Sequence, residues 1–566
     1  MKEISIFVLG PSAMPIAQKV KVAVGGLIHG PEGLNGCDLN FEKASHAIGR
    51  AFLLKHPVIG ICAAGILIRS VASRLTHKDI EPPVIAVAED GSSVVPLLGG
   101  HHGANDLARR ISELTLGHAA ITTASDVVFA NSLDEPLAAS LANPADHKTA
   151  AAARLRGEEI VQEVTIYCQQ GGPRHLVYHP WTLAVGIGCE RGADPAEVKQ
   201  LFKDTLAKHN LAEQSIFQYA SIDLKEDEAA IDQFGNSFFF TAEQLRAESH
   251  RITSPSAIVE AEVGTPSVAE AAALALVGPN GKLIVPKTKN KRATIAIAQA
   301  AHFDDFQNHK GKQRGHISLV GIGPGSSGMM TPDVNFELWY ATEWVGYSLY
   351  LDLVENLRSG QTRHDFPLGD EEARCRHAIE LAKQGKRVAL VCSGDPAIYA
   401  MAALVYELID REPNRIKVEV HPGISAFQAA SAKAGAMIGH DFCCISLSDL
   451  LTPWEAIEKR IKAAAEGDFV ISFYNPRSLK RRDQLERAFA ILEEHRPPDT
   501  PVVVASNLGR PEENVRIRKF SEFDPEEVDM LTLVMVGSSQ SKSITRGDGK
   551  TYAYTPRGYA KKMDAL

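Results

Sequence analysis

The feature of this sequence that most constrains its fold is KRVALVCSGDPAIYAMAALVYEL at residues 386–408. Apolar residues 388–391 predict a buried strand, and a small-residue turn then leads directly into an apolar-rich helix. Gly394 lacks a Cβ, so the turn can adopt strained backbone angles and let a ligand approach the main chain. Pro396 fixes its own φ and suits the first turn of the helix. This order predicts a small-molecule site at the carboxyl edge of an α/β sheet, or simply a tight structural connection.

Length and composition indicate a folded protein with several domains. The 566 residues are too many for one core, and 45% hydrophobic with 23% charged residues is ordinary for folded domains. A net charge of −9 argues against a general nucleic-acid binder, which would be basic. The longest apolar run, residues 58–68, is shorter than the roughly 20 residues that span a bilayer, and the N-terminus lacks a signal-peptide cleavage pattern. We expect a cytoplasmic protein without nucleic-acid or membrane partners.

Cysteine and histidine usage gives no metal signature. The eight cysteines are scattered without a CxxC pair, which favours reduced thiols over a disulfide framework or a zinc site. His101 and His102 are the only neighbouring histidines, and adjacent side chains usually point apart, which disfavours a metal role. We therefore expect no bound metal.

Residues 1–143 alternate apolar, strand-like runs with helical stretches. Residues 82–100 predict two strands joined by an Asp-Gly hairpin. In GGHHGANDLARRISEL, either Asn105 or Asp106 is placed to cap a helix. Small-residue turns at several strand ends are typical of a ligand surface, and equally of tight α/β connections.

A second unit follows a stretch of weaker periodicity. Residues 144–181 predict an alanine-rich helix and a short β run, which we interpret as a connecting segment. LAVGIGCERGADPAEVKQLF then predicts a strand, a glycine turn, an N-cap at Asp194 and a helix with Pro195 at its first position. Farther on, the basic loop 287–292 is either a solvated turn or a site for an anionic group of a ligand.

Several strings of this first half are similar to the cobalamin-biosynthesis family called CbiG, namely GHHGANDLARR, ITTASD, GIGCERGA, SVAEAAAL and GKLIVPK. The resemblance covers residues 5–302, although GHHGAN is one glycine shorter than the usual form of the family. It implies the opening of a lactone on a cobalt-containing corrinoid precursor, with loss of a two-carbon fragment. It carries no catalytic residue over to this sequence.

The polar, basic string FQNHKGKQRGH at residues 306–316 predicts the clearest domain boundary. The glycines of VGIGPGSSG, which follows, are those of a dinucleotide fingerprint. However, Pro324 interrupts the turn and no helix opens at once, so a Rossmann oxidoreductase is disfavoured. Later strands are apolar nearly throughout, as in sheets covered on both faces.

The ordered motifs VGYSLYL, SGDPAIYAMA, VEVHPGISAFQAA, GHDFCCISLSDLLTPWE, FYNPRSLKRRDQL and VVVASNLGR resemble the tetrapyrrole methylases. Within that family, GHDFCCISLSDLLTPWE and FYNPRS are similar to the precorrin-3B C17-methyltransferases. The resemblance covers residues 315–557 and implies a two-domain α/β fold with the cofactor cleft between the domains. Ala397 and Ala400 stand where the family has glycines, which tightens the turn but leaves Gly394 and Asp395 in place.

The resemblance implies S-adenosylmethionine as the cofactor, with no metal and no covalent nucleophile. Because the cofactor already carries a good leaving group, positioning of its methyl supplies much of the rate. The implied cofactor-binding residues lie mostly in turns at strand ends: Pro324, Gly325, Gly394, Asp395, Ile398, Tyr399, Ser425, Ala426, Tyr474, Asn507 and Thr532.

The implied substrate is a large, flat tetrapyrrole with many carboxylates, which call for cationic partners. Arg477, Lys480 and Arg481 are the candidates for substrate binding, and a solvated helix face is the alternative reading of this charge run. Asp449, with Ser448, is the candidate catalytic group, as a proton acceptor or substrate orienter; its alternative role is to cap the helix that follows.

Together these features predict a fused, multidomain α/β enzyme of corrin biosynthesis. The C-terminal half is expected to methylate precorrin-3B at C17 with ring contraction to precorrin-4. The alternatives are cobalt-factor III as substrate, or another target carbon. The N-terminal half is a lactone-opening hydrolase or only a corrinoid-binding module, and related methylases suggest a homodimer. The expected divisions are 1–143, 144–181 (connecting), 182–305, 306–315 (linker), 316–423 and 424–557.

Overall fold

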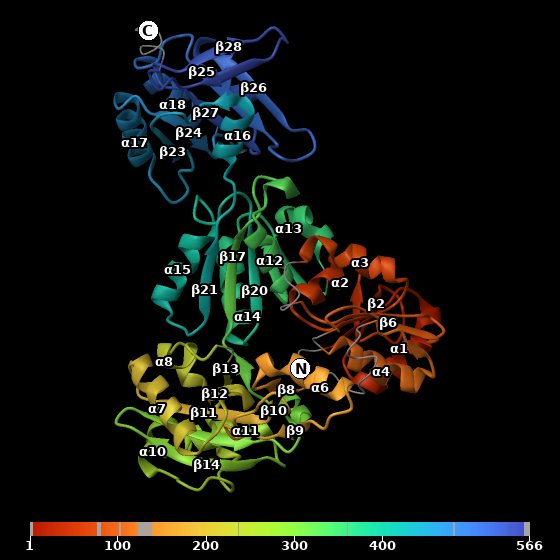
Figure 1. Cartoon of the computed structure of the whole chain (residues 1–566). Coiled ribbons are helices and arrows are strands. Elements are labelled where there is room, and N and C mark those ends of the chain that lie inside the picture. Colours follow the sequence, from red (N-terminus) through yellow and green to blue (C-terminus); the bar gives the residue numbers. More distant parts are fainter. Residues whose placement is uncertain are drawn as a thin grey trace.

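The computed structural model describes residues 4–75, 81–100, 103–122, 133, 138–235, 237–358, 360–478 and 482–559. Strands in these residues gather into six sheets, most of them covered by helices, which confirms the predicted multidomain α/β class (Figure 1). Among the described helices, none is both long and apolar enough to cross a lipid bilayer.

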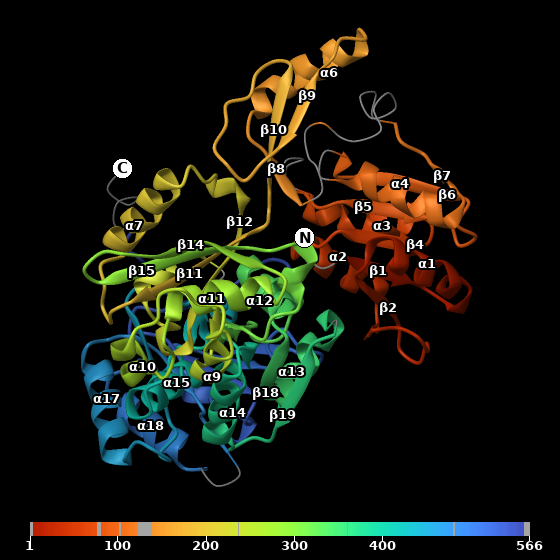
Figure 2. The same ribbon diagram turned by 90° about the horizontal axis from the view of Figure 1, so that it is seen from below.

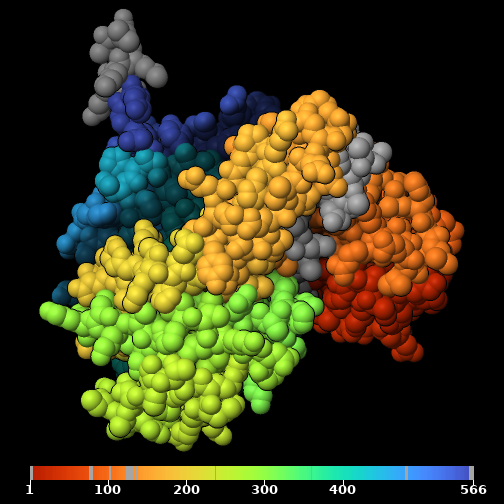
Figure 3. All heavy atoms as spheres, turned by 60° about the horizontal axis from the view of Figure 1, so that its bottom comes forward, coloured from red at the N-terminus to blue at the C-terminus, as the bar shows by residue number. Residues whose placement is uncertain are grey.

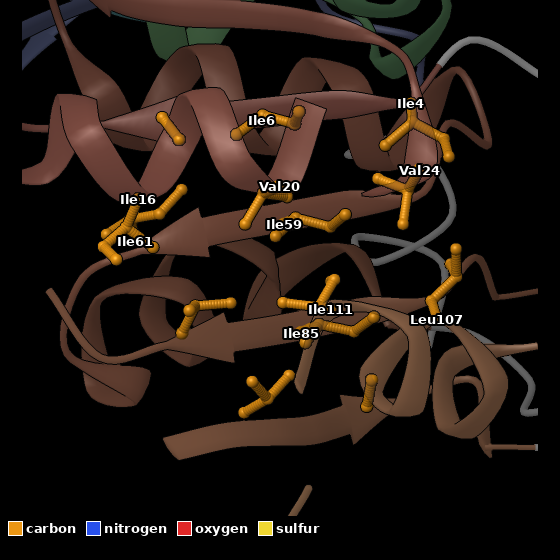
Figure 4. Packing of buried hydrophobic residues seen from close by; sticks show 14 of the residues in the cluster. Ile4, Ile6, Ile16, Val20, Val24, Ile59, Ile61, Ile85, Leu107 and Ile111 are labelled. Carbon is orange, nitrogen blue, oxygen red and sulfur yellow. The ribbon is translucent and has the colours of Figure 1, made fainter. Parts of the chain in front are cut away.

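The first sheet has the strand order β3-β2-β1-β4-β5-β6-β7 and belongs to a lobe at one side of the molecule (Figure 3). Ile6 and Val8 of β1 face one layer of helices and Phe7 faces the other, because successive strand residues point to opposite faces. Figure 4 shows the first of these two cores. The elements are β1 (Ser5–Val8), α1 (Met14–Val24), β2 (Leu27–Pro31), β3 (Leu39–Phe41), α2 (Ala44–Leu53), β4 (Val58–Ile61), α3 (Ala64–Val71), β5 (Val84–Val87), β6 (Ser93–Leu98), α4 (Ala104–Thr115) and β7 (His118–Ala119).

Two local expectations in this lobe have different outcomes. Strands β5 and β6 pair antiparallel around Gly91, which confirms the predicted hairpin. The predicted helix cap is wrong. Helix α4 begins at Ala104 with Gly103 as its N-cap at φ 88°, so Asn105 and Asp106 lie inside the first turn. A glycine takes the cap position because that backbone conformation is left-handed.

The expected connecting segment, 144–181, contributes two strands to a small sheet of order β8-β10-β9, whose strand β8 comes from the end of the expected first division. Its core joins Leu133, Ala150, Leu176 and Tyr178, and the Tyr178 hydroxyl donates to the Leu133 carbonyl at 2.7 Å. Figure 2 shows α6, β9 and β10 standing away from the neighbouring sheet. The elements are β8 (Ala139–Leu141), α6 (His147–Leu155), β9 (Val161–Val164) and β10 (His175–Pro180).

The third sheet has the order β14-β15-β11-β12-β13-β16. Asp194 accepts from the backbone N–H of Ala196 at 2.9 Å and Pro195 opens α7, as predicted. Part of the expected linker adds the edge strand β16 to this sheet. The elements are β11 (Leu183–Cys189), α7 (Pro195–Lys208), β12 (Ile216–Ile222), α8 (Ala229–Asp232), β13 (Ser237–Phe240), α9 (Ala242–Arg246), α10 (Ala257–Val263), α11 (Val268–Val277), β14 (Lys282–Lys289), β15 (Ala293–Gln299) and β16 (Lys312–Gln313).

The fourth sheet is wholly parallel, with the order β19-β18-β20-β17-β21. Helices α12 and α13 cover one face, and α14 and α15 cover the other. The connections after β17 and after β20 leave in opposite directions, so a crevice opens between the carboxyl ends of these two strands. The elements are β17 (His316–Gly321), α12 (Pro332–Tyr340), β18 (Glu343–Tyr347), α13 (Ser348–Val354), β19 (Thr362–Phe366), α14 (Glu371–Lys383), β20 (Arg387–Cys392), α15 (Met401–Arg411) and β21 (Lys417–His421).

The last subdomain is built on a mixed sheet of order β23-β24-β27-β25-β26, with the small sheet β22-β29-β28 beside it. Helices α17 and α18 cover one face of the mixed sheet, and α16 packs on the other. The elements are α16 (Ala426–Ala434), β22 (Gly435–Ala436), β23 (Phe442–Ser446), α17 (Trp454–Glu466), β24 (Val470–Tyr474), α18 (Gln484–Glu493), β25 (Pro501–Ser506), β26 (Asn514–Lys519), β27 (Thr532–Val536), β28 (Lys542–Thr545) and β29 (Thr551–Tyr554).

One arginine joins the first lobe to the parallel sheet, where α2 and α3 face α12 and α13 (Figure 1). Arg50 of α2 donates from Nε to the Trp339 carbonyl and from Nη2 to the Ala341 carbonyl, the latter at 2.8 Å. These carbonyls end α12, where a helix leaves acceptors unsatisfied and carries partial negative charge. The Arg74 guanidinium lies 4.6 Å from the centre of the Trp339 ring. The two halves are therefore docked through a cross-domain helix cap.

Replacing Arg50 with alanine should loosen the end of α12. Charge-assisted hydrogen bonds contribute about 1.5–3 kcal/mol, so amides near 339–343 should exchange roughly ten times faster or more. Hydrogen exchange with mass spectrometry measures this change, and Arg69→Ala, at an exposed position on α3, is the matched control. Unchanged exchange in Arg50→Ala would show that the contact does not hold the halves together.

Candidate functional site

A cleft lies between the parallel sheet and the last subdomain. It has a volume of about 310 Å³ and is lined from both sides. Pro324 follows β17 and Gly394 follows β20, so the cleft begins at the crevice that the sheet topology creates. Residues of the β25 and β27 ends close it from the opposite side, among them Asn507 and Thr532. This size is at the lower end of small-molecule sites.

The turn after β20 has the backbone that the sequence predicts at Gly394. Its φ is +66°, in the left-handed region, and a Cβ there would meet only the Ser425 Cα at 3.9 Å. Gly394 exchanges backbone hydrogen bonds with Gly323 of the opposite turn, at 2.8 and 3.3 Å. The main chain at Gly394 is therefore open to a ligand.

The helix does not follow this turn directly, which corrects the expectation for Pro396. Helix α15 begins five residues later, at Met401. Asp395 Oδ1 accepts from the backbone N–H of Ala397 at 2.8 Å, and Tyr399 has a φ of 52°. A local side-chain turn and a left-handed residue hold this segment out of the helix. The segment consequently lines the cleft instead.

Two further glycines let the three strand-end turns touch each other. A Cβ on Gly321, at the end of β17, would lie 2.5 Å from the Gly394 carbonyl oxygen. A Cβ on Gly423, after β21, would lie 2.1 Å from the same oxygen and 2.4 Å from the Gly321 oxygen. Real Cβ atoms do not approach the backbone this closely, so the turns can pack together only because both positions are glycine.

The structure brings nearly all of the predicted cofactor residues to this one cleft. Gly325 is the exception: it does not line the cleft but packs half-buried against the loop after β25, where a Cβ would meet Arg510 Cγ at 2.4 Å and the Leu508 oxygen at 2.9 Å. The residues that line the cleft are Pro324, Gly394, Asp395, Ile398, Tyr399, Ser425, Ala426, Tyr474, Asn507 and Thr532. Their roles in binding stay predictions.

Two tyrosines join the subdomains across the cleft. The Tyr399 hydroxyl donates to the Cys444 carbonyl of β23 at 2.8 Å, and the Tyr399 and Tyr474 rings lie 5.2 Å apart. The Tyr474 oxygen accepts from the backbone N–H of Phe427, at the start of α16, at 3.4 Å. Burial raises the pKa of both phenols, so they remain protonated donors near neutral pH.

Three residues of this cleft have a left-handed backbone. Tyr399, Asn475 and Asn507 line it with φ values of 52°, 49° and 51°. Glycine and, less often, asparagine adopt this region readily, whereas a tyrosine does so at a cost of about 1–2 kcal/mol. Such strain persists where the surrounding packing over-determines the conformation, and it clusters at ligand sites.

Those predicted catalytic and substrate residues that the structure describes, Ser448, Asp449 and Arg477, do not line the cleft. Asp449 is exposed and accepts from Gln484 Nε2 at 3.0 Å; it does not cap α17, whose N-cap is Pro453. Ser448 donates its backbone N–H to Ser446 Oγ at 3.3 Å. Arg477 pairs with Glu526 and donates to the Pro525 carbonyl at 2.8 Å. Lys480 and Arg481, like His101 and His102, lie outside the described residues. These assignments stay predictions.

Sequence reasoning missed a second group of cleft residues, from α13, α14 and the loop after β25. The principal ones are Tyr350, Arg374 and Arg510. Arg374 had a detectable signal, because it shares a helical stripe with Ala378 and Ala382, both buried. An arginine at such a core position is unusual and favours a function or a buried partner. Tyr350 and Arg510 had no comparable pattern.

The arrangement describes an α/β protein that binds a small molecule between two subdomains, through open backbone, aromatic rings and cationic groups. Comparison with known proteins is consistent with this class. Residues 316–524 match the family described as Tetrapyrrole (Corrin/Porphyrin) Methylases. Residues 183–298 match Cobalamin synthesis G C-terminus, and residues 46–126 match Cobalamin synthesis G N-terminal.

Three relatives sharpen the comparison. The probable cobalt-factor III C(17)-methyltransferase of Salmonella typhimurium is 46% identical, over 43% of this chain and 99% of that protein. The precorrin-3B C(17)-methyltransferase of Sinorhizobium sp is 41% identical, over 44% of this chain and 98% of that protein. Cobalamin biosynthesis protein CobIJ of Mycobacterium tuberculosis is 44% identical over 43% of this chain. The matched region spans about half (48%) of the length of CobIJ. The chain therefore belongs to the tetrapyrrole methylases, which confirms the resemblance in the sequence, and that family uses S-adenosylmethionine.

Gly423→Ala tests the backbone packing at the strand ends. Inserting a methyl group 2.1 Å from a carbonyl oxygen forces the turns apart, which should cost about 1–3 kcal/mol and lower the melting temperature. Gly328→Ala is the matched control, because its Cβ would meet only Ser326 Oγ at 3.7 Å. Equal melting temperatures for the two variants would contradict the close packing.

Proposed function

We propose that this protein methylates C17 of precorrin-3B, or of its cobalt-containing counterpart cobalt-factor III, with S-adenosylmethionine and with contraction of the ring. The observation that carries the proposal is the near-complete match of the C-terminal half to two C17-methyltransferases, 41% and 46% identical. In addition, ten of the residues implied by the family line a single cleft in this chain.

The cleft residues fit the proposed cofactor. The open main chain at Gly394 admits a ligand against the backbone, and Ile398, Leu508 and Leu533 offer apolar surface for a flat base. Tyr399 and Tyr474 offer aromatic faces and hydroxyls. S-Adenosylmethionine supplies an electrophilic methyl on a sulfonium and needs no metal or protein nucleophile for its transfer.

The residues of the chain act mainly by positioning. The Tyr399–Cys444 hydrogen bond holds the subdomains in register, and the interlocked strand-end turns fix the floor of the cleft. Holding two reactants in line converts a bimolecular reaction into an effectively unimolecular one and supplies a large part of the barrier lowering. Asp449 does not line the cleft, and its predicted role as a proton acceptor or substrate orienter stays a prediction.

The N-terminal half carries a second proposal. Matches to both Cobalamin synthesis G regions support a lactone-opening hydrolase acting on a corrinoid intermediate. A binding module that shelters the corrinoid is the alternative. Analogy with related methylases supports a separate proposal, a homodimer in solution, which sedimentation measurements check directly.

Label transfer tests the methylase. Full-length protein is incubated without oxygen with precorrin-3B or cobalt-factor III and methyl-labelled S-adenosylmethionine, and NMR locates the label. We expect label at C17 of a ring-contracted product, and the preferred substrate identifies the metal-free or the cobalt route. Label at another carbon, or transfer to neither compound, would overturn the C17 assignment.

Release of the two-carbon fragment tests the first half. Full-length protein given the lactone-containing, ring-contracted cobalt corrinoid should add one water and release the fragment, which mass spectrometry detects. Gly423→Ala, which perturbs only the methylase cleft, should leave this activity unchanged. Intact C17 methylation without any fragment would favour the binding module over the hydrolase.

A further inference from the structure

Arg374 stands out among the cleft residues because it is buried without a counter-charge. It lies on α14, is only 3% exposed, and lines the same cleft as the predicted cofactor residues. Its Nη2 donates to the Pro367 carbonyl at 3.1 Å, its Nη1 lies 3.9 Å from the Met401 sulfur, and its Nε has no hydrogen-bond partner. Most of its five N–H donors are therefore left without a strong acceptor.

No carboxylate among the described residues forms an ion pair with this guanidinium. Glu371 and Asp395 line the same cleft, but Glu371 accepts from the backbone N–H of Gly369 at 3.3 Å. Asp395 accepts from the backbone N–H groups of Ala397 and Gly423, at 2.8 and 3.3 Å. Burying a cation without a partner is costly, so a protein retains one where an anion from outside completes the site.

The surroundings of Arg374 also suit an acidic ligand with flat apolar parts. Tyr350 lies beside it, and burial raises the pKa of this phenol while the charges of Arg510 and Arg374 oppose the rise. The Arg510 guanidinium lies 6.0 Å from the centre of the Tyr350 ring, and its Nε donates to the Pro324 carbonyl at 3.1 Å. This part of the cleft therefore holds two guanidinium groups around one partly buried aromatic ring.

We propose that Arg374 is the carboxylate-binding residue of the cleft, taking a carboxylate of the bound ligand through two parallel N–H···O bonds. A planar guanidinium suits that geometry better than an ammonium. The proposal rests on the proposed function, which brings two carboxylate sources to the cleft. One is the amino-acid end of S-adenosylmethionine, and the other is an acidic side chain of the tetrapyrrole.

The test uses the full-length protein with two probes, S-adenosylhomocysteine and uroporphyrin, an octacarboxylate tetrapyrrole. Calorimetry or fluorescence gives the affinity of each probe for wild type, Arg374→Met, Arg374→Lys and Arg376→Met. The last variant is the matched control, since Arg376 lies on the same helix but is exposed and paired with Glu372 and Glu412. Removing a charge-assisted pair should weaken one probe about 10–100-fold in Arg374→Met. Arg374→Lys should recover only part of that loss.

Which probe weakens identifies the source of the carboxylate, and either result supports the subsite. Since the methionine variant removes an uncompensated buried charge, its melting temperature should equal or exceed that of wild type. A variant that binds both probes as wild type does would overturn the subsite alone. So would a low melting temperature in Arg374→Met accompanied by full affinity in Arg374→Lys, because that pattern describes a structural arginine. A wild-type protein that binds neither probe would count against the proposed function itself.

Discussion

The C-terminal half depends on backbone packing where three parallel strands end. The Gly394 carbonyl oxygen lies where a Cβ of either Gly321 or Gly423 would be, so the turns after β17, β20 and β21 meet main chain to main chain. No other residue type offers such a close approach. This contact draws the β20 turn against the β17 turn and fixes the position of Asp395. One carboxylate oxygen of Asp395 accepts from the backbone N–H of Ala397, and the other accepts from the backbone N–H of Gly423. The floor of the cleft is therefore built from main chain, and the side chains around it inherit their positions.

A second constraint is that the other wall of the cleft comes from a different subdomain. Tyr399 leaves the β20 turn with a left-handed backbone and reaches the Cys444 carbonyl on β23. Leu508 and Arg510 pack on Gly325 from the loop after β25. Tyr399, Asn475 and Asn507, all with left-handed backbone, lie along this seam, and at Tyr399 the local conformational preference is overruled by packing between the two subdomains. The shape of the cleft therefore depends on how the two subdomains pack against each other.

The sequence predicted what local chemistry determines. Apolar runs located the strands, Asp194 and Pro195 located the start of α7, and the Asp-Gly dipeptide located the hairpin between β5 and β6. It failed in two ways. Helix α15 starts late because of a local side-chain turn at Asp395, which the apolar pattern does not show. Strand β10 exists because the separate segments β8 and β9 flank it. Arg374 went unnoticed because its burial is created by the packing of α14 on the sheet. A single sequence shows its position on a helix but not the empty donors beside it.

A comparison with Arg496, another buried arginine, shows how Arg374 differs in its hydrogen-bond partners. Arg496, whose side chain is fully buried, donates to the carbonyls of Gly537, Ala465, His495 and Phe469 and pairs with Asp468 at 3.1 Å. Its donors are satisfied, so its role is to hold the ends of several elements together. Arg374 combines similar burial with one strong acceptor and an open cleft. The two guanidinium groups are similarly buried but unequally paired, so they differ in what they gain from an incoming anion. Only Arg374 has free donors to offer it.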